Sequence, residues 1–174
     1  MLATMPSMQR ILIVGICGAG KSTLASELAE RLDLPVIHLD KEYWQPGWTM
    51  PDCDWWHDRV QELVSGERWV MDGSYASTLR YRLPRADTVI HLDFPRRIAM
   101  YRIFKRILHT HGQTRPDMAD ECREQFDWEF LKYAWAFPRT ERVKLESMLT
   151  ELGPGQMLLR LKRPRDVVGF LRTL

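Results

Sequence analysis

The chain of 174 residues carries a formal net charge of +2, and 45% of its residues are hydrophobic and 28% charged. These values are typical of one soluble globular domain, and so small a charge does not by itself indicate a nucleic-acid or membrane partner. With no apolar run typical of a signal peptide before Arg10 and no stretch long enough to span a bilayer, we expect neither a leader nor a membrane anchor. Because Cys17, Cys53 and Cys122 lack zinc-ligand spacing and cannot all pair, we expect a reducing, cytoplasmic environment.

The first predicted elements are a strand over 10–14 and a helix over 21–32, joined by a glycine-rich segment. The run 11–14 is continuously apolar, as in a buried parallel strand, and apolar residues recur at helical spacing after residue 21. Between them, residues 15–22 read Gly-Ile-Cys-Gly-Ala-Gly-Lys-Ser and match G-x-x-x-x-G-K-[ST], the P-loop. A strand before this motif and a helix after it are the context in which it binds nucleotides, so we predict a nucleotide site here.

The P-loop carries the groups that a nucleotide-phosphate site needs. Backbone N–H groups of the loop and the positive end of the helix dipole both attract an anion. We expect Lys21 to reach the β- and γ-phosphates of ATP and the hydroxyl of Ser22 to ligate Mg²⁺. ATP and Mg²⁺ are therefore the predicted cofactors. The residues predicted to bind ATP through this loop are Gly15, Gly18, Ala19, Gly20, Lys21, Ser22 and Thr23.

Along the rest of the chain, apolar stretches alternate with helical patterns, which predicts a parallel sheet with helices on both faces. We therefore predict a single α/β domain over residues 1–174 with the P-loop NTPase fold and a five-stranded parallel sheet. Within it we assign a helical segment on the acceptor side to 41–66 and a lid to the polar, irregular segment 109–125. The further predicted strands are 35–39, 69–71, 88–92 and 156–161, and the further helices are 54–64, 96–108, 126–137, 140–152 and 166–171.

Three carboxylates follow predicted strands, at the sheet edge where the P-loop must lie. They are Asp40, Asp72 and Asp93. Asp72 or Asp93 is expected to hold Mg²⁺ directly or through water, and Asp40 is placed to orient or deprotonate an acceptor hydroxyl. The alternative for each is a helix cap or a turn residue, a role that aspartate commonly has.

Longer motifs carry a family resemblance. The run Asp87-Thr-Val-Ile-His-Leu-Asp-Phe-Pro95 with Arg102-Ile-Phe-Lys-Arg106 resembles adenylate kinase and other nucleoside monophosphate kinases. The segments 38–48, 69–75 and 126–135 are similar to those of the adenylate-kinase-like P-loop proteins known as DNA topology modulation proteins. The resemblance covers nearly the whole chain and implies an adenylate-kinase-like fold and a phosphotransferase.

The resemblance also implies roles for arginines after the fourth strand. Arg102 would pack on the nucleotide base and Arg106 would contact its phosphates. Residues four apart on a helix share a face, in agreement with a joint role, although a solvated basic face is the alternative. Arg139 and Arg142 would close onto phosphate as lid arginines do, or Arg142 would form a surface salt bridge with Glu146.

The acceptor side departs from the monophosphate kinase pattern. Those kinases place a phosphate-gripping arginine soon after their Asp-Gly, whereas Asp72-Gly73 is followed here by Ser74-Tyr75, and arginine appears only at 80 and 82. Aromatic faces suit a base or a sugar ring. The predicted acceptor-binding residues are Asp40, Trp44, Trp48, Asp72 and Tyr75. Helical periodicity assigns Trp128, Leu131 and Trp135 to the core and leaves Trp55 open between the core and the acceptor side.

The leading functional hypothesis is a phosphotransferase that moves the γ-phosphoryl group of ATP to a small acceptor, with Lys21, Asp40 and Arg106 as catalytic residues. One alternative is a nucleotide-dependent DNA-associated protein, in which a stripe of basic residues on the helix 96–108 follows the phosphates. No recognisable DNA-binding module supports it. A second alternative is an ATPase switch without a small acceptor. The sequence leaves the identity of the acceptor and the oligomeric state open.

Overall fold

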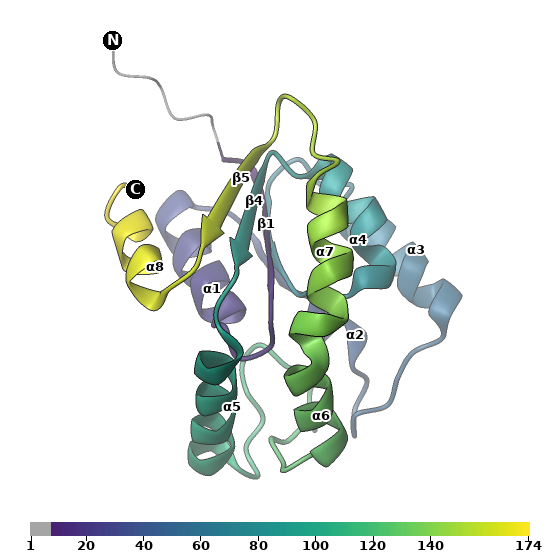
Figure 1. Cartoon of the computed structure of the whole chain (residues 1–174). Coiled ribbons are helices and arrows are strands. Elements are labelled where there is room, and N and C mark those ends of the chain that lie inside the picture. Colours follow the sequence, from purple (N-terminus) through teal and green to yellow (C-terminus); the bar gives the residue numbers. More distant parts are fainter. Residues whose placement is uncertain (1–7) are drawn as a thin grey trace.

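The computed structural model describes residues 8–174, and within them a single sheet of five parallel strands organises the fold (Figure 1). The strand order is β2-β3-β1-β4-β5, so the P-loop strand lies in the centre. This confirms the predicted five-stranded parallel sheet. The strands are β1 (Arg10–Gly15), β2 (Val36–His38), β3 (Trp69–Asp72), β4 (Thr88–Leu92) and β5 (Met157–Leu161).

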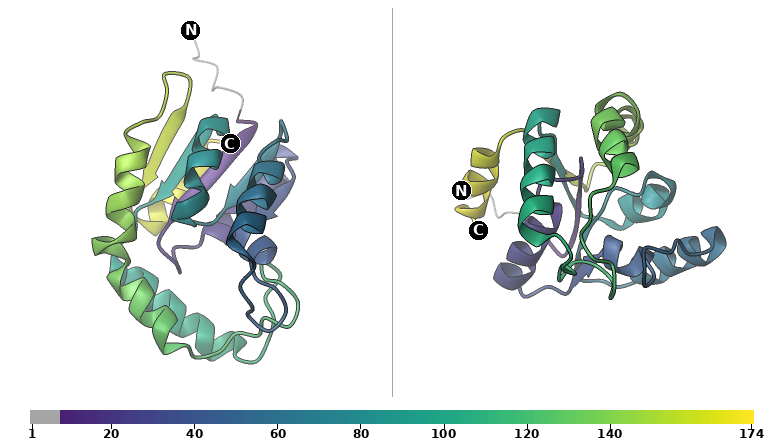
Figure 2. Two further views of the ribbon diagram at one scale, coloured as in Figure 1. Left: turned by 90° about the vertical axis from the view of Figure 1, so that its right-hand side faces the viewer. Right: turned by 90° about the horizontal axis from the view of Figure 1, so that it is seen from below.

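Helices cover both faces of this sheet, as Figure 2 shows from below. The central strand explains the two layers, because alternate side chains of a strand point to opposite faces. Ile11 and Ile13 pack in the core cluster that contains α1 residues, whereas Leu12 and Val14 pack in the cluster that contains residues of α3, α4 and α7. The helices are α1 (Lys21–Leu32), α2 (Leu39–Tyr43), α3 (Cys53–Leu63), α4 (Ala76–Arg82), α5 (Arg96–Thr110), α6 (Trp128–Ala136), α7 (Glu141–Leu149) and α8 (Pro164–Leu171).

Two helices were not predicted as separate elements, α2 and α4. α2 begins directly after β2, inside the stretch predicted as strand, and is only five residues long. α4 lacks an apolar stripe in the sequence because its buried face is Thr78, Leu79 and Arg82, of which only one is apolar. Hydrophobic periodicity detects neither, since it needs several apolar residues at regular spacing.

The structure corrects the sequence interpretation of the tryptophans that were expected in the core and decides that of Trp55, which was left open. Trp55 is 46% exposed, and its neighbour Trp56, at 3%, is the core residue of α3. On α6, Leu131 is buried as predicted, but Trp128 and Trp135 are 58% and 55% exposed. Leu131 and Ala134 pack against α5, so the two tryptophans, which lie seven residues apart, share a different face of the helix. The guanidinium of Arg96 lies 3.7 Å from the centre of the Trp135 ring.

The pair α5 and α6 extends past the carboxyl edge of the sheet (Figure 1), and the segment 111–127 joins its far ends. In the left view of Figure 2, this segment runs beside the loop that follows α2. Met118, Ala119 and Cys122 pack there against Trp44 and Trp48. Segments from both halves of the chain therefore enclose the carboxyl edge of the sheet. None of the helices described is long and apolar enough to cross a membrane.

Candidate active site

The P-loop connects the central strand β1 to the first residue of α1, Lys21. Its turn is closed by a hydrogen bond from the amide of Ala19 to the carbonyl of Ile16, at 3.1 Å. Gly18 has φ +78°, and a Cβ there would lie 2.6 Å from the carbonyl oxygen of Ala99 on α5. A larger residue is therefore excluded twice, by the backbone conformation and by the close approach of α5. The loop has the local geometry that the motif predicts.

Lys21 lies over its own loop. Its Nζ donates to the carbonyl oxygens of Gly15 at 2.9 Å and Ile16 at 3.2 Å. These carbonyls belong to the part of the loop that the motif assigns to phosphate binding. The ammonium group is thus held next to the predicted phosphate site by weak acceptors that an anionic phosphate can replace.

A buried carboxylate faces Ser22. Asp72 is the last residue of β3 and is 2% exposed; its Oδ1 lies 3.5 Å from the Ser22 hydroxyl oxygen, and its Oδ2 lies 2.5 Å from Nδ1 of His38. Burial raises the pKa of Asp72, while the hydrogen bond and charge of His38 oppose the rise. Burial alone would lower the pKa of His38, but the hydrogen bond and charge of Asp72 raise it. The strand register explains the contact, because Asp72 pairs with both Ile13 and His38.

This arrangement fits the magnesium ion that the P-loop implies. A hydroxyl and a carboxylate oxygen, both partly or fully withdrawn from water, are the hard oxygen ligands that Mg²⁺ prefers. Because Asp72 is buried, an uncompensated negative charge on its carboxylate is unfavourable. A divalent cation would offset this cost. Ser22 and Asp72 are therefore the residues that could hold it.

Asp93 has different contacts from those expected of a metal ligand. Its two carboxylate oxygens accept hydrogen bonds from Arg142, from Nε at 2.8 Å and from Nη2 at 2.9 Å. This bidentate pair holds the pKa of Asp93 below its usual value. The sequence left two roles open for Arg142, a lid arginine or a salt bridge with Glu146. Its distance to Glu146, 3.9 Å, is longer than its distances to Asp93, so Asp93 is the main partner. Of the two carboxylates predicted to bind metal, the contacts favour Asp72.

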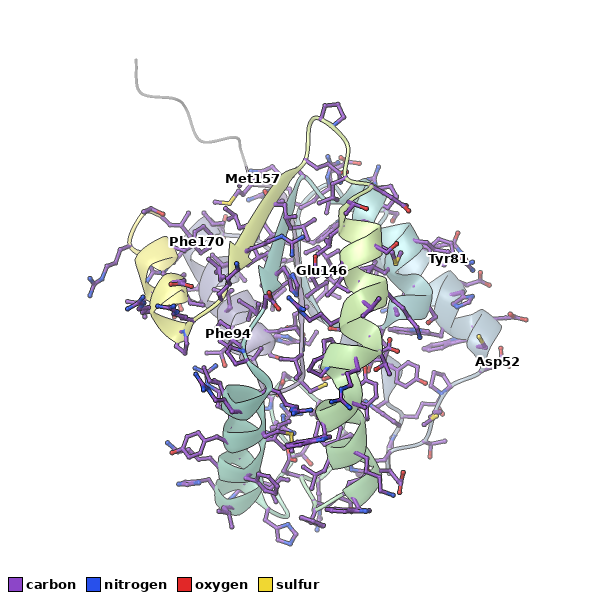
Figure 3. All side chains as sticks on the ribbon, in the orientation of Figure 1. Asp52, Tyr81, Phe94, Glu146, Met157 and Phe170 are labelled. Atoms are coloured by element: carbon purple, nitrogen blue, oxygen red, sulfur yellow. The ribbon has the colours of Figure 1, made fainter. Side chains whose placement is uncertain are left out.

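Asp93 and Arg142 instead line a cavity of about 450 Å³ next to the P-loop residue Ile16. Phe94 (Figure 3), two residues before α5, and Phe137, directly after α6, form apolar parts of its wall. Arg96 and Arg139 complete a wall with three guanidinium groups. A second cavity of about 560 Å³ shares Asp93 and is lined by Pro95, Arg97, Ile98, Lys162, Arg163, Pro164 and Arg165.

The two arginines of α5 have separate partners. Arg102 donates from Nη1 to the carbonyl of Ala19 in the P-loop, at 2.8 Å, and its guanidinium carbon lies 5.4 Å from the centre of the Phe94 ring. Arg106 pairs with Glu124, with Nε 3.0 Å from Oε2. Arg102 is thus in contact with the P-loop, whereas Arg106 is held by the segment 111–127.

On the opposite side of the P-loop, Asp40 meets Tyr75. The tyrosine hydroxyl donates to Oδ1 of Asp40 at 2.7 Å. Burial and the charge of Asp40 raise the pKa of Tyr75, so the phenol remains a donor. The residue before it, Ser74, donates from its hydroxyl to the Gly15 carbonyl at 2.7 Å and accepts from the Gly15 amide at 3.3 Å. Two successive residues therefore connect the P-loop to Asp40.

Aromatic rings surround this contact. The Tyr43 ring lies within 4.8–5.1 Å, centre to centre, of the rings of Trp44, Trp56 and Tyr75. Trp48 extends the group, with its ring 5.3 Å from that of Trp44. The structure thus brings together the predicted acceptor residues Asp40, Trp44, Trp48 and Tyr75, with Asp72 at the neighbouring strand end.

Trp48 also contacts the segment 111–127. Its backbone has φ +62°, a left-handed conformation that is rare for a bulky residue. The ring Nε1 donates to the carbonyl of Arg123 at 3.1 Å, and the thiol of Cys122 donates to the carbonyl of Gln45 at 3.4 Å. The loop after α2 and the predicted lid therefore touch through specific hydrogen bonds.

Three residues of the site escaped the sequence analysis: His38, Arg82 and Glu124. His38 is the last residue of β2, and its place at the carboxyl end of a predicted parallel strand is the signal that could have assigned it to this edge. Arg82 and Glu124 look like ordinary surface charges in the sequence, yet they are 0% and 5% exposed. Only tertiary contacts reveal them.

A family comparison agrees with this geometry. A family model described as an AAA domain matches residues 11–127, which include the P-loop, Asp40 and Asp72. The chain belongs to this AAA domain family. Among curated proteins, none matches the chain.

Several solved structures similar to this AAA domain chain are shikimate kinases. The enzyme from Acinetobacter baumannii, in complex with shikimate, has a TM-score of 0.58 at 18% identity, covering 97% of this chain and 94% of that one. The one from Bacteroides thetaiotaomicron has a TM-score of 0.54 at 18% identity, with 95% of each chain covered. The one from Aquifex aeolicus has a TM-score of 0.51 at 17% identity, with 94% of each covered. At such identity the likeness shows the fold, which is that of a P-loop kinase.

Proposed function

We propose that the protein is an ATP-dependent kinase that transfers the γ-phosphoryl group to a hydroxyl of a small molecule. The observation that carries this proposal is the connection between two sites. The P-loop contacts Asp72 through Ser22 and reaches Asp40 through Ser74 and Tyr75. A phosphate site and a candidate base thus lie on the same edge of the sheet, which a plain nucleotide switch does not require.

The nucleotide side has a residue for each part of phosphoryl transfer. Lys21 lies over the loop carbonyls that border the phosphate site, and Ser22 with Asp72 could hold Mg²⁺. Arg102 contacts the P-loop at Ala19, next to a cavity that is rich in arginine. When bound, the magnesium ion would neutralise developing charge on the phosphates.

Asp40 is the candidate base on the acceptor side. Only one of its oxygens is engaged by Tyr75, and an aspartate acts as base through a carboxylate oxygen within hydrogen-bond reach of the acceptor hydroxyl. The Tyr75 hydroxyl fixes the orientation of the carboxylate. The segment 111–127, in contact with Trp48, is placed to act as the lid that excludes water from the reaction. Three free cysteines fit a cytoplasmic enzyme.

The alternative of a DNA-associated protein has weaker support from the contacts. The predicted stripe on α5 consists of Arg96, Arg97, Arg102, Lys105 and Arg106. Arg97 and Lys105 are exposed, but Arg96 stacks on Trp135, Arg102 bonds to Ala19, and Arg106 pairs with Glu124. Guanidinium groups with internal partners are less available to follow a phosphate backbone, which is what binding to DNA requires.

The test is ADP release from Mg·ATP in the presence of a panel of nucleosides, nucleoside monophosphates, sugars and amino alcohols, with Lys21→Met protein as the blank. A kinase gives a rate that rises about 10²-fold or more above background with one acceptor class and only when Lys21 is present. A slow rate that no acceptor changes would overturn the proposal and favour an ATPase switch.

A further inference from the structure

The acceptor side is notable for how its cations are used. An enzyme that recognises a phosphate or carboxylate on its substrate normally presents a guanidinium to it, often in a bidentate contact. The elements around Asp40 carry several arginines that could do this. Their contacts decide whether any guanidinium is available to a ligand.

Arg82 is fully buried and serves the backbone. Its Nη1 donates to the carbonyl of Gly73 at 2.9 Å, and its Nη2 donates to the carbonyls of Ser74 at 3.0 Å and Tyr75 at 2.8 Å. These carbonyls form the turn that carries Tyr75 to Asp40. Arg82 thus fixes this turn from within the protein, and its side chain is 0% exposed, so solvent does not reach its guanidinium.

Arg59 of α3 is neutralised by two carboxylates. It lies 2.8 Å from Glu42 of α2 and 2.6 Å from Glu62 on its own helix. The hydrogen bonds and charges of both carboxylates raise the pKa of Arg59. The pair with Glu42 joins α3 to α2, the helix that carries Asp40. The excess charge around Arg59 is negative.

Arg106 and Arg115 converge on one buried carboxylate, that of Glu124. The Nε atoms of the two arginines lie 3.0 and 3.1 Å from its Oε2 atom. Arg115 also pairs with Asp117, at 2.8 Å. Two arginines and two carboxylates give a network of zero net charge, in which each guanidinium already has an anionic partner.

The groups that remain for a ligand are a carboxylate and aromatic faces. Within residues 8–174, the side-chain contact of Asp40 is that of its Oδ1 with the Tyr75 hydroxyl, which leaves Oδ2 for a ligand, and the Tyr75 ring is grouped with those of Tyr43 and Trp44. Among the described residues, the other cations of these elements, Lys41, Arg80 and Arg123, are exposed, and no contact places them at Asp40. A carboxylate repels an anionic acceptor, whereas rings and a carboxylate accept a neutral or cationic one.

We propose that the phosphoryl acceptor is a hydroxyl compound that carries no phosphate or carboxylate group, such as a nucleoside, a neutral sugar or an amino alcohol. This inference rests on the proposed function. In the transfer, the acceptor oxygen bonds to the γ-phosphorus as the bond between that phosphorus and the β–γ bridging oxygen breaks. ADP leaves with the bridging oxygen, and the hydroxyl proton passes to the free oxygen of Asp40.

The experiment compares matched acceptors that differ in one anionic group. The pairs keep every hydroxyl of the acceptor: the methyl ester of a uronic acid and the free uronic acid, the methyl ester of a hydroxy acid and the free hydroxy acid, and an amino alcohol and the amino acid that adds one carboxylate to it. We expect the member without the anion to have a kcat/KM at least about 10-fold higher, which equals about 1.4 kcal/mol. An equal or higher value for the anionic member overturns the acceptor class and leaves the kinase function intact. A panel in which no acceptor raises ADP release overturns the kinase function, and the acceptor class with it.

A variant tests the cause. Glu124→Gln removes one of the two charges that neutralise Arg106 and Arg115, so the preference for the non-anionic member should fall several-fold. Glu121→Gln, exposed in the same segment, is the control and should leave the preference unchanged. Binding of both members of a pair to wild-type protein loaded with a non-hydrolysable ATP analogue gives a second readout if Glu124→Gln does not fold. The proposal requires tighter binding of the non-anionic member there, and equal binding contradicts it.

Discussion

The nucleotide side and the acceptor side of this site are built in different ways. The first comes from one continuous run, residues 15–23, whose backbone turn and helix start make the phosphate site. The second joins α2, the loop after it, the turn after β3 and the segment 111–127. These meet through contacts such as Trp48 with Arg123 and Cys122 with Gln45, which join residues 75 and 77 positions apart. The contiguous site depends on local backbone geometry, whereas the dispersed site depends on the tertiary fold.

Two glycines with nearly the same backbone conformation, one on each side, test this difference. Gly18 in the P-loop has φ +78° and Gly47 in the loop after α2 has φ +75°, but only a Cβ at Gly18 meets other atoms, with the Ala99 carbonyl at 2.6 Å. The left-handed conformation costs an alanine about 1–2 kcal/mol, and overpacking adds about 1–3 kcal/mol. Gly18→Ala should therefore lose about 3 kcal/mol of unfolding free energy and its affinity for ATP, while Gly47→Ala loses about 1 kcal/mol.

Urea unfolding and titration with an ATP analogue measure both effects. If Gly18→Ala and Gly47→Ala proved equally stable, α5 would not press on the P-loop as the structure describes. Loss of ATP affinity in Gly47→Ala would show that the two sides are not separable.

The second prediction concerns Arg82, which holds the turn between the two sides. Arg82→Met keeps most of the buried volume but leaves the carbonyls of Gly73, Ser74 and Tyr75 without their donor. Unsatisfied buried acceptors cost about 1–3 kcal/mol each and add incompletely, so we expect a loss of about 3 kcal/mol in unfolding free energy. Arg80→Met, on the exposed face of α4, is the control and should change stability by less than about 0.5 kcal/mol. A loss as small as that of the control would mean that water satisfies these carbonyls.

The same contrast explains what could be predicted from the sequence. The P-loop, the five strands and the ends of α1 follow from local patterns, since an apolar run or a motif carries its own geometry. Arg82 and Glu124 could not be predicted, because a charged residue is buried only when distant segments supply its partners: backbone carbonyls for Arg82, and Arg106 with Arg115 for Glu124. For Trp128 and Trp135, the pattern gave a helix correctly but the wrong buried face.

The acceptor residues show an intermediate case. Asp40 and Asp72 could be placed at one edge because the carboxyl ends of parallel strands meet there. Asp93 follows the same rule, yet Arg142 of α7 engages both of its oxygens, and the position of α7 over β4 is a tertiary fact. Strand ends therefore predict which residues are near the site, and helix packing decides which of them are free.

Two histidines, one at the end of β2 and one on β4, extend the contrast to the pH dependence of stability. Nδ1 of His38 donates to Asp72, and the pKa of His38 is raised above its ordinary value of 6.5. His91 on β4 is buried, and burial lowers its pKa below 6.5. Arg160 lies 3.4 Å from its Nδ1 and can only donate, which disfavours a proton on that nitrogen, whereas the carboxylate of Glu146 on α7 (Figure 3), 3.5 Å from the same nitrogen, favours one.

The opposite shifts predict opposite pH dependences. The folded state binds the His38 proton more tightly than the unfolded chain, so its contribution to stability is complete below pH 6.5 and is lost as the pH rises through the folded pKa. For His91 the contribution is complete above pH 6.5 and is lost as the pH falls through the lower folded pKa. The destabilisation caused by His38→Gln should therefore shrink from pH 6 to 8.5, whereas that caused by His91→Gln should shrink from pH 7.5 to 5. Urea unfolding of both variants and wild type across this range, without added magnesium, measures the two slopes. Slopes of the same sign would mean that one histidine does not have the environment described here. Repeating the measurement in an Asp72→Asn background identifies which, because that change abolishes the pH dependence at His38 and leaves that at His91 unchanged.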